Sequence, residues 1–169
     1  ATIEGINIVG NTTYTDAELL RDFELSVGGW FSFLSSDNKY SREKLKGDIE
    51  TLTSYYKDRG YVEFVLSSSQ VSITPDKKSV YITLNVDEGL PYKIDNISLT
   101  GDLPVDEEIL RPLILLKEGD TYSQFLITET EEIFTNILGN EGYSFAEVKG
   151  VPDLNEETGG VDLTFYIDP

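Results

Sequence analysis

The 169-residue sequence predicts an α+β protein of two tandem domains, at residues 1–91 and 92–169. The main evidence is an internal repeat, in which Gly60-Tyr61 recurs 82 residues later as Gly142-Tyr143. A repeat of about 80 residues has the size of a small domain and is too long for a solenoid unit. In each copy, the periodicity of the apolar residues predicts the element order β-α-α-β-β. We therefore expect two copies of one fold, each a three-stranded mixed sheet with two helices on one face.

The first copy opens with a strand and a short helix. Apolar residues alternate over Ile3–Val9, and Gly10-Asn11 ends that strand. Thr15 and Glu18 have the spacing of a capping box, in which each side chain bonds the backbone N–H of the other. A helix is therefore expected from Thr15 to about Glu24.

The second helix is expected to start at Ser41 and to end at Gly60, because helices commonly end at a residue with a left-handed backbone conformation, which glycine adopts readily. Its apolar residues recur at spacings of four, three and four, which places them in one stripe facing the sheet. With the inward positions of the strands, they form the predicted interior of the first domain: Ile6, Ile8, Leu20, Leu45, Ile49, Leu52, Tyr56, Ile82 and Leu84.

Two strands complete the first copy, joined by a turn at Thr74–Lys78. Val80–Val86 has bulky residues on both faces, which predicts the central strand. Val62–Ile73 is longer and more polar, and its apolar residues change from even to odd positions. A strand of strict period two cannot do this, so we expect one extra residue, a β-bulge, near Ser67–Ser69 of an edge strand.

The second copy repeats this layout. The sequence predicts a strand at Ile94–Leu99, a short helix within Asp106–Leu115, a helix capped by Ser123, and strands at Phe145–Val148 and Val161–Ile167 joined by an acidic turn at Pro152–Gly160. Pro112 argues against a longer first helix, because proline removes a helical hydrogen bond.

The composition excludes several classes of function. The chain has 31 acidic and 13 basic residues, a net charge of −18, and neither His nor Cys. Histidine-based acid–base catalysis, Ser-His-Asp and Cys-His nucleophiles and Cys/His zinc sites are therefore absent. A surface this acidic disfavours binding to the phosphate backbone of a nucleic acid. No apolar run is long enough to span a membrane. The charge is uneven, at −5 for residues 1–91 and −13 for residues 92–169.

Few residues suggest a ligand site. The adjacent glutamate pairs are interpreted as solvated surface, because neighbouring residues point in different directions. Asp153–Glu157 lacks the glycine and the late glutamate of a calcium loop. We expect no catalytic residue, cofactor or metal. The loop residues Trp30, Phe31, Phe33 and Leu34 either cover an open end of the core or form an exposed contact site.

The layout resembles the POTRA family. The resemblance rests on Gly10-Asn11 after the first strand, Gly60-Tyr61 after the second helix, and a closing strand that ends in Asp87-Glu88-Gly89. Leu45–Leu52, Ser54–Tyr56 and the aromatic loop make the first copy similar to the third POTRA domain of outer-membrane barrel-assembly proteins. The second copy resembles the fourth, although Thr130 occupies a position where a larger apolar residue is expected.

The resemblance implies a periplasmic, non-enzymatic scaffold that forms part of an outer-membrane protein. Its implied partners are a BamB-like propeller lipoprotein, other subunits of the assembly machinery, and unfolded outer-membrane proteins that bind by strand pairing. An edge strand offers unpaired backbone groups to such segments. We therefore expect partner binding at Phe64, Val65, Leu66, Ser67, Ser68, Ser69, Gln70 and Val71, with the aromatic loop as a second contact. The alternatives are a POTRA pair of another transporter, such as a two-partner secretion porin, or an unrelated enzyme or inhibitor.

Overall fold

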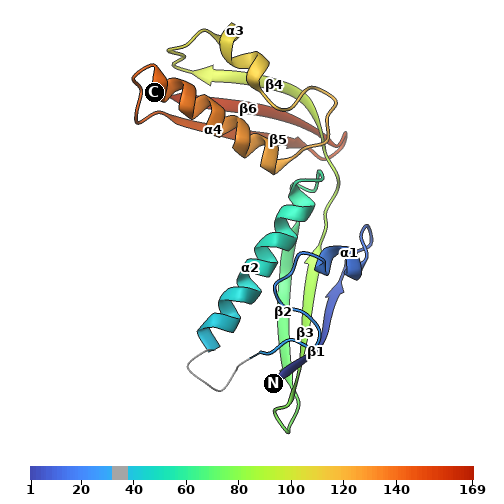
Figure 1. The fold of residues 1–169 in the computed structure, drawn as a ribbon. Helices are drawn as coiled ribbons and strands as arrows, with labels where there is room; N and C mark the ends of the chain where they lie inside the picture. The colour runs from blue at the N-terminus through green and yellow to red at the C-terminus, as the bar shows by residue number, and fades with distance from the viewer. Residues whose placement is uncertain (32–37) are drawn as a thin grey trace. The chain divides into compact units, whose positions relative to one another are not determined.

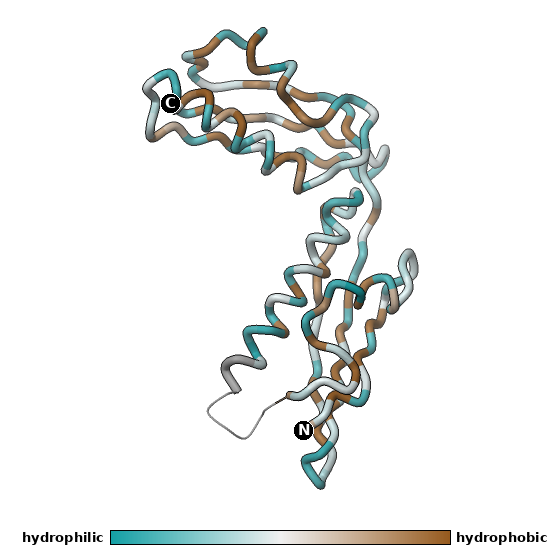
Figure 2. The backbone as a smooth tube through the Cα atoms, viewed as in Figure 1, coloured by the Kyte–Doolittle hydropathy of each residue, from teal (hydrophilic) through white to brown (hydrophobic). Residues whose placement is uncertain are grey.

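A computed structural model describes residues 1–31 and 38–169 (Figure 1). The chain divides into two compact units. Unit 1 comprises Ala1–Tyr56 and Glu63–Gly89, and unit 2 comprises Lys57–Val62 and Leu90–Pro169. Each unit holds one three-stranded sheet. Hydrophobic positions are distributed along the strands and helices of both units (Figure 2).

Unit 1 follows the predicted element order. Its elements are β1 (Thr2–Val9), α1 (Asp16–Leu20), α2 (Asn38–Lys57), β2 (Val65–Ile73) and β3 (Ser79–Asp87). The strand β3 lies in the centre, parallel to β1 and antiparallel to β2, which confirms the mixed sheet. The Thr15 side chain accepts a hydrogen bond from the Glu18 N–H, so the predicted helix start is confirmed, but α1 ends at Leu20 rather than Glu24.

The core of unit 1 lies on one face of its sheet. Alternate residues of β3 are buried there, whereas Tyr81 on the opposite face is 46% exposed. Since only one face is buried and both helices contribute to the core, α1 and α2 cover the same face. Two details differ from the prediction. Leu19, not Leu20, is buried in α1. In α2, Leu52 and Tyr56 are buried as predicted, whereas Leu45 and Ile49 are only half-buried and the polar residue Asp48 is buried between them.

Unit 2 repeats the arrangement. Its elements are β4 (Lys93–Gly101), α3 (Glu107–Leu110), a 3₁₀ helix η1 (Arg111–Leu113), α4 (Gln124–Asn140), β5 (Glu147–Asn155) and β6 (Gly160–Asp168). The sheet order is β4-β6-β5, again with one parallel and one antiparallel pair. Pro112 falls in the 3₁₀ turn, so the first helix is short, as predicted.

The prediction for β5 was wrong at its far end. Residues 152–155, which were predicted to belong to a turn, continue the strand, and Pro152 lies opposite Leu163. Proline is compatible with a strand only where its missing N–H faces away from the sheet. The polar residue Thr130 is fully buried in α4, where its hydroxyl donates to the Leu126 carbonyl at 2.8 Å and accepts from the Leu115 N–H at 3.2 Å.

Candidate functional site

The strand β2 is an edge strand with β3 as its one neighbour. Its pairing register shifts between Leu66, opposite Val86, and Ser68, opposite Asn85. Ser67 is therefore the extra residue, and the predicted bulge is confirmed. The repeat contains the same information, because the offset between the copies falls from 82 at Gly60 to 81 at Val80.

The direction of each backbone N–H in β2 follows from the hairpin. The Thr74 N–H donates to the Ser79 carbonyl at 3.0 Å, which makes these residues a hydrogen-bonded pair. In an antiparallel ladder, bonded and non-bonded pairs alternate. Ser69, Val71 and Ile73 therefore direct their N–H groups away from β3. Among the described residues, no side chain caps the N–H of Ser69 or Val71.

The opposite edge of this sheet, β1, is covered by its own chain. The Ile3 N–H donates to the Gly29 carbonyl at 2.8 Å, and the Ile3 carbonyl accepts from the Gly28 N–H at 2.6 Å. The Ile8 N–H donates to the Asp16 carboxylate at 3.3 Å. An incoming segment would have to displace these bonds, so β2 is the more accessible of the two edges of unit 1.

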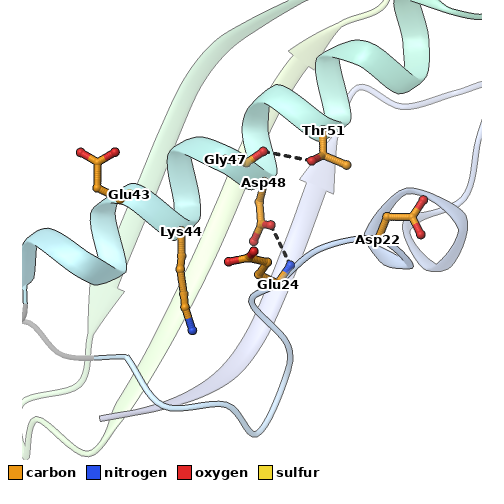
Figure 3. A pocket seen from close by; sticks show the side chains of 7 residues that line it. All are labelled: Asp22, Glu24, Glu43, Lys44, Gly47, Asp48 and Thr51. Carbon is orange, nitrogen blue, oxygen red and sulfur yellow. Dashed lines mark hydrogen bonds between the residues drawn. The ribbon is translucent and has the colours of Figure 1, made fainter.

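A shallow acidic pocket lies between α2 and the preceding loop, lined by Asp22, Glu24, Glu43, Lys44, Gly47, Asp48 and Thr51 (Figure 3). The Asp48 carboxylate accepts the N–H groups of Glu24, at 2.7 Å, and Leu25, at 3.0 Å. Burial raises the pKa of Asp48 above its ordinary value, against the opposing effect of these two bonds. Asp48 therefore ties the loop to α2. The described residues contain no group of acidic side chains arranged to hold a metal ion.

A second buried carboxylate, Glu88, joins the end of β3 to the loop after β1. It accepts the Tyr56 hydroxyl at 2.7 Å, the Thr12 hydroxyl at 2.7 Å and the Thr13 N–H at 3.1 Å. Burial acts to raise the pKa of Glu88, but these hydrogen bonds together outweigh it and hold the pKa below its ordinary value. The arrangement is structural, because Glu88 is 8% exposed and its carboxylate already accepts hydrogen bonds from donors of the chain.

The comparison with known families agrees with this architecture. A model of the POTRA family, described as "Surface antigen variable number repeat", matches residues 1–89 and 92–169. The chain belongs to the POTRA family. Both units therefore carry the POTRA fold, with a three-stranded mixed sheet and helices.

Relatives of these two POTRA units are named outer membrane protein assembly factor BamA. The chain is 30% identical to the protein of Neisseria meningitidis serogroup B over 170 residues, covering 100% of the chain and 21% of the relative. It is also 30% identical to the protein of Buchnera aphidicola, covering 98% of the chain and 27% of the relative. The chain thus spans about a fifth to a quarter of the length of these relatives.

Among solved structures, the chain is similar to Haemophilus influenzae BamA POTRA3-5. The TM-score is 0.90 at 25% identity, covering 99% of this chain and 66% of the other. Within the described residues, no helix combines the length and the hydrophobicity needed to cross a bilayer.

The residues predicted for partner binding are not all at the surface of the first POTRA unit. Phe64 precedes β2, is 3% exposed and stacks on Tyr56 with ring centroids 4.2 Å apart. Phe31 is 1% exposed and Trp30 is 75% exposed. Phe64 and Phe31 are thus core residues, because almost none of their surface is accessible, whereas Trp30 remains available for contact.

The remaining predicted residues, Val65, Leu66, Ser67, Ser68, Ser69, Gln70 and Val71, all lie in β2. Phe33 and Leu34 lie outside the described residues. Sequence reasoning missed Asp48 and Glu88, since their partners lie 23 to 76 residues away along the chain. A polar residue inside an apolar helical stripe is the one signal that could have indicated Asp48.

Proposed function

We propose that the chain is a periplasmic scaffold module of an outer-membrane protein assembly factor, and that it docks extended protein segments along the β2 edge of unit 1. The observation that carries the proposal is the combination of assembly-factor relatives along the whole chain with an edge strand, β2, on which no described side chain caps the outward N–H groups of Ser69 and Val71. The proposed partners are a BamB-like lipoprotein, further assembly subunits and unfolded outer-membrane proteins.

Backbone pairing suits this role because it does not depend on the partner's sequence. An added strand bonds the outward N–H and C=O groups, and the side chains contribute only mild preference. The bulge at Ser67 interrupts the regular ladder on one side of the docking segment. Bulges twist an edge and limit indiscriminate pairing, so this one would favour a partner of fitting shape.

The side chains along the proposed docking segment are accessible. Ser69 is exposed, Val71 is half-buried and Ile73 is 39% exposed, although all three lie opposite buried residues of β3. An incoming strand would therefore meet both backbone donors and a modest apolar surface. Such a contact suits reversible handling of many segments better than permanent assembly.

The test is the substitution Val71→Pro, which removes one outward N–H without breaking a bond to β3. The equivalent position in unit 2 is occupied by Pro152, so the fold accommodates proline there. Loss of one net hydrogen bond of about 0.5–1.5 kcal/mol would weaken binding of a BamB-like lipoprotein about 2- to 10-fold, and the ring adds steric exclusion. Binding would be measured by isothermal titration calorimetry.

The matched control is Val71→Thr, which keeps the N–H and nearly the same side-chain shape. It should bind like the original chain. Equal affinity of the proline and original proteins, with both folded by circular dichroism, would place docking elsewhere, and Trp30 would be the next residue to substitute.

A further inference from the structure

The second sheet has an equivalent edge strand, β5, which pairs with β6 in continuous register from Glu147 to Asn155. Its outward N–H groups are identified by a side-chain contact. The Gly150 N–H donates to the Glu131 carboxylate of α4 at 2.8 Å, so it faces away from β6. Because the register is unbroken, the backbone nitrogens of Val148, Pro152 and Leu154 face away from β6 as well.

Two of these outward positions are unavailable to an incoming strand. Gly150 already has an acceptor in Glu131, and Pro152 has no N–H. Proline on an edge strand is one of the known ways in which proteins prevent edge-to-edge association. The middle of the β5 edge is therefore closed by the Glu131 carboxylate at Gly150 and by the missing N–H donor at Pro152.

The position of α4 makes the Glu131 contact possible. A Cβ atom at Gly150 would lie 2.6 Å from the Ile127 side chain and 3.0 Å from the ring of Phe165. A larger residue would thus push the helix away from β5. The absence of a side chain at Gly150 lets α4 approach closely enough for Glu131, one turn after Ile127, to reach the strand.

The first unit differs at each of these three positions. By the repeat offsets of 81 and 82, Gly150 corresponds to Ser69, Pro152 to Val71, and Glu131 to Ile49. Ser69 lies opposite Leu84 just as Gly150 lies opposite Phe165, so the strand correspondence holds in space. Isoleucine has no acceptor for an N–H, and Val71 retains its donor. The same fold therefore presents an open edge in one unit and a closed edge in the other.

We propose that β5 is a closed strand-accepting surface, in which the Glu131 carboxylate competes with an incoming extended segment for the Gly150 N–H. When the Glu131 carboxylate is removed and Pro152 is replaced by a residue with an N–H, β5 binds an extended peptide strand by backbone pairing. The charged side chains of the strand itself are Glu147, Lys149 and Asp153, and residues 92–169 together have a net charge of −13, which favours a peptide with basic flanks. This inference goes beyond the proposed function, because it concerns unit 2 and does not depend on docking at β2.

The probe is a synthetic peptide with the sequence of Gly160–Asp168, the strand with which β5 already pairs, extended by two lysines at each end. Binding would be followed residue by residue through the amide NMR signals. The test protein carries Glu131→Ala with Pro152→Val. The matched control carries Glu132→Ala with Pro152→Val, which removes the same charge from the next residue of α4 but keeps the cap.

In the test protein we expect the amide signals of β5 to shift on titration and the affinity for the peptide to exceed that of the control at least tenfold. Signals of β2 report docking at unit 1 separately, so failure of one proposal is distinguishable from failure of the other. Unchanged β5 signals in the test protein would overturn the inference. So would equal shifts along β5 in the original chain, since its edge would then be open.

Amide hydrogen exchange of the single variants gives an independent reading if the double variant does not fold. Glu131→Ala should speed exchange of the Gly150 N–H about tenfold or more, whereas Lys149 and Val151, which bond β6, should stay protected. Glu132→Ala should leave Gly150 unchanged, and Glu131→Gln should restore part of the protection because its amide oxygen still accepts. Unchanged exchange at Gly150 in Glu131→Ala would refute the capping role.

Discussion

Replacing Glu88 by alanine should destabilise unit 1 specifically. The substitution removes a carboxylate that accepts hydrogen bonds from Thr12, Thr13 and Tyr56. Thr12 and Thr13 are exposed and can bond water instead, but the Tyr56 side chain is 0% exposed and loses its charged acceptor in the interior. A buried group deprived of an acceptor costs about 1–3 kcal/mol, and hydrogen bonds to charged groups lie at the upper end of the range. We therefore expect a loss of about 2–3 kcal/mol in the free energy of unfolding.

Native-state hydrogen exchange can resolve this effect, because the two units need not unfold together. The slowest amides of β3 report the opening free energy of unit 1, and those of β6 report unit 2 as an internal control. The exposed Glu4→Ala is the matched control for loss of one negative charge. In a Tyr56→Phe background the Glu88→Ala effect should shrink, because the hydroxyl no longer needs the carboxylate. A loss below about 0.5 kcal/mol in β3 would mean that the arrangement contributes nothing beyond a surface contact.

The lowered pKa of Glu88 predicts that the stability of unit 1 depends on pH, and the same hydrogen-exchange measurement can follow it. The pKa of Glu88 lies below its ordinary value of 4.5 in the folded chain. The unfolded state therefore binds the proton first, and the stabilisation present above pH 4.5 is lost as the pH falls through the folded pKa. The Glu88→Gln variant should lack this part of the acid sensitivity. An unchanged acid profile in that variant would contradict the assignment.

Three further predictions concern the interiors of the two units. Leu52→Ala, at a site 1% exposed, should cost unit 1 about 2–5 kcal/mol in urea denaturation, and a loss below about 0.5 kcal/mol would show that α2 does not bury this face. Thr130→Val should destabilise unit 2 by about 1–3 kcal/mol, since the Leu115 N–H loses its acceptor, while β3 amides keep their exchange rates. The pKa of Asp48 is raised above 3.8, mainly by burial, so its folded form binds the proton more readily. Its contribution should therefore favour the folded state of unit 1 as the pH falls toward 3.8, opposite in sign to that of Glu88. Asp48→Asn should remove this contribution, so the opening free energy of β3 should fall more steeply with acidification than in the original chain.

The element order and the mixed sheets of both units could be predicted from local and repeated patterns in the sequence. The repeat predicted two copies. The capping box at Thr15 and Glu18, the cap at Ser123 and the apolar stripes predicted the helices, because these signals depend on residues within a few positions of one another. The bulge of β2 was also predictable. An extra residue reverses the alternation of the side chains, and this reversal is visible in the sequence around Ser67.

Which backbone groups are available at the sheet edges could be known only from the packed fold. Alternation tells which face a side chain occupies, but the direction of an N–H depends on the partner strand and on how the hairpin closes, as at Thr74 and Ser79. The cap of Gly150 by Glu131 joins residues 19 positions apart, and it required the close approach of α4 that a glycine permits. Contacts of this kind arise from packing between elements, so two copies with the same order of helices and strands present one open edge and one closed edge.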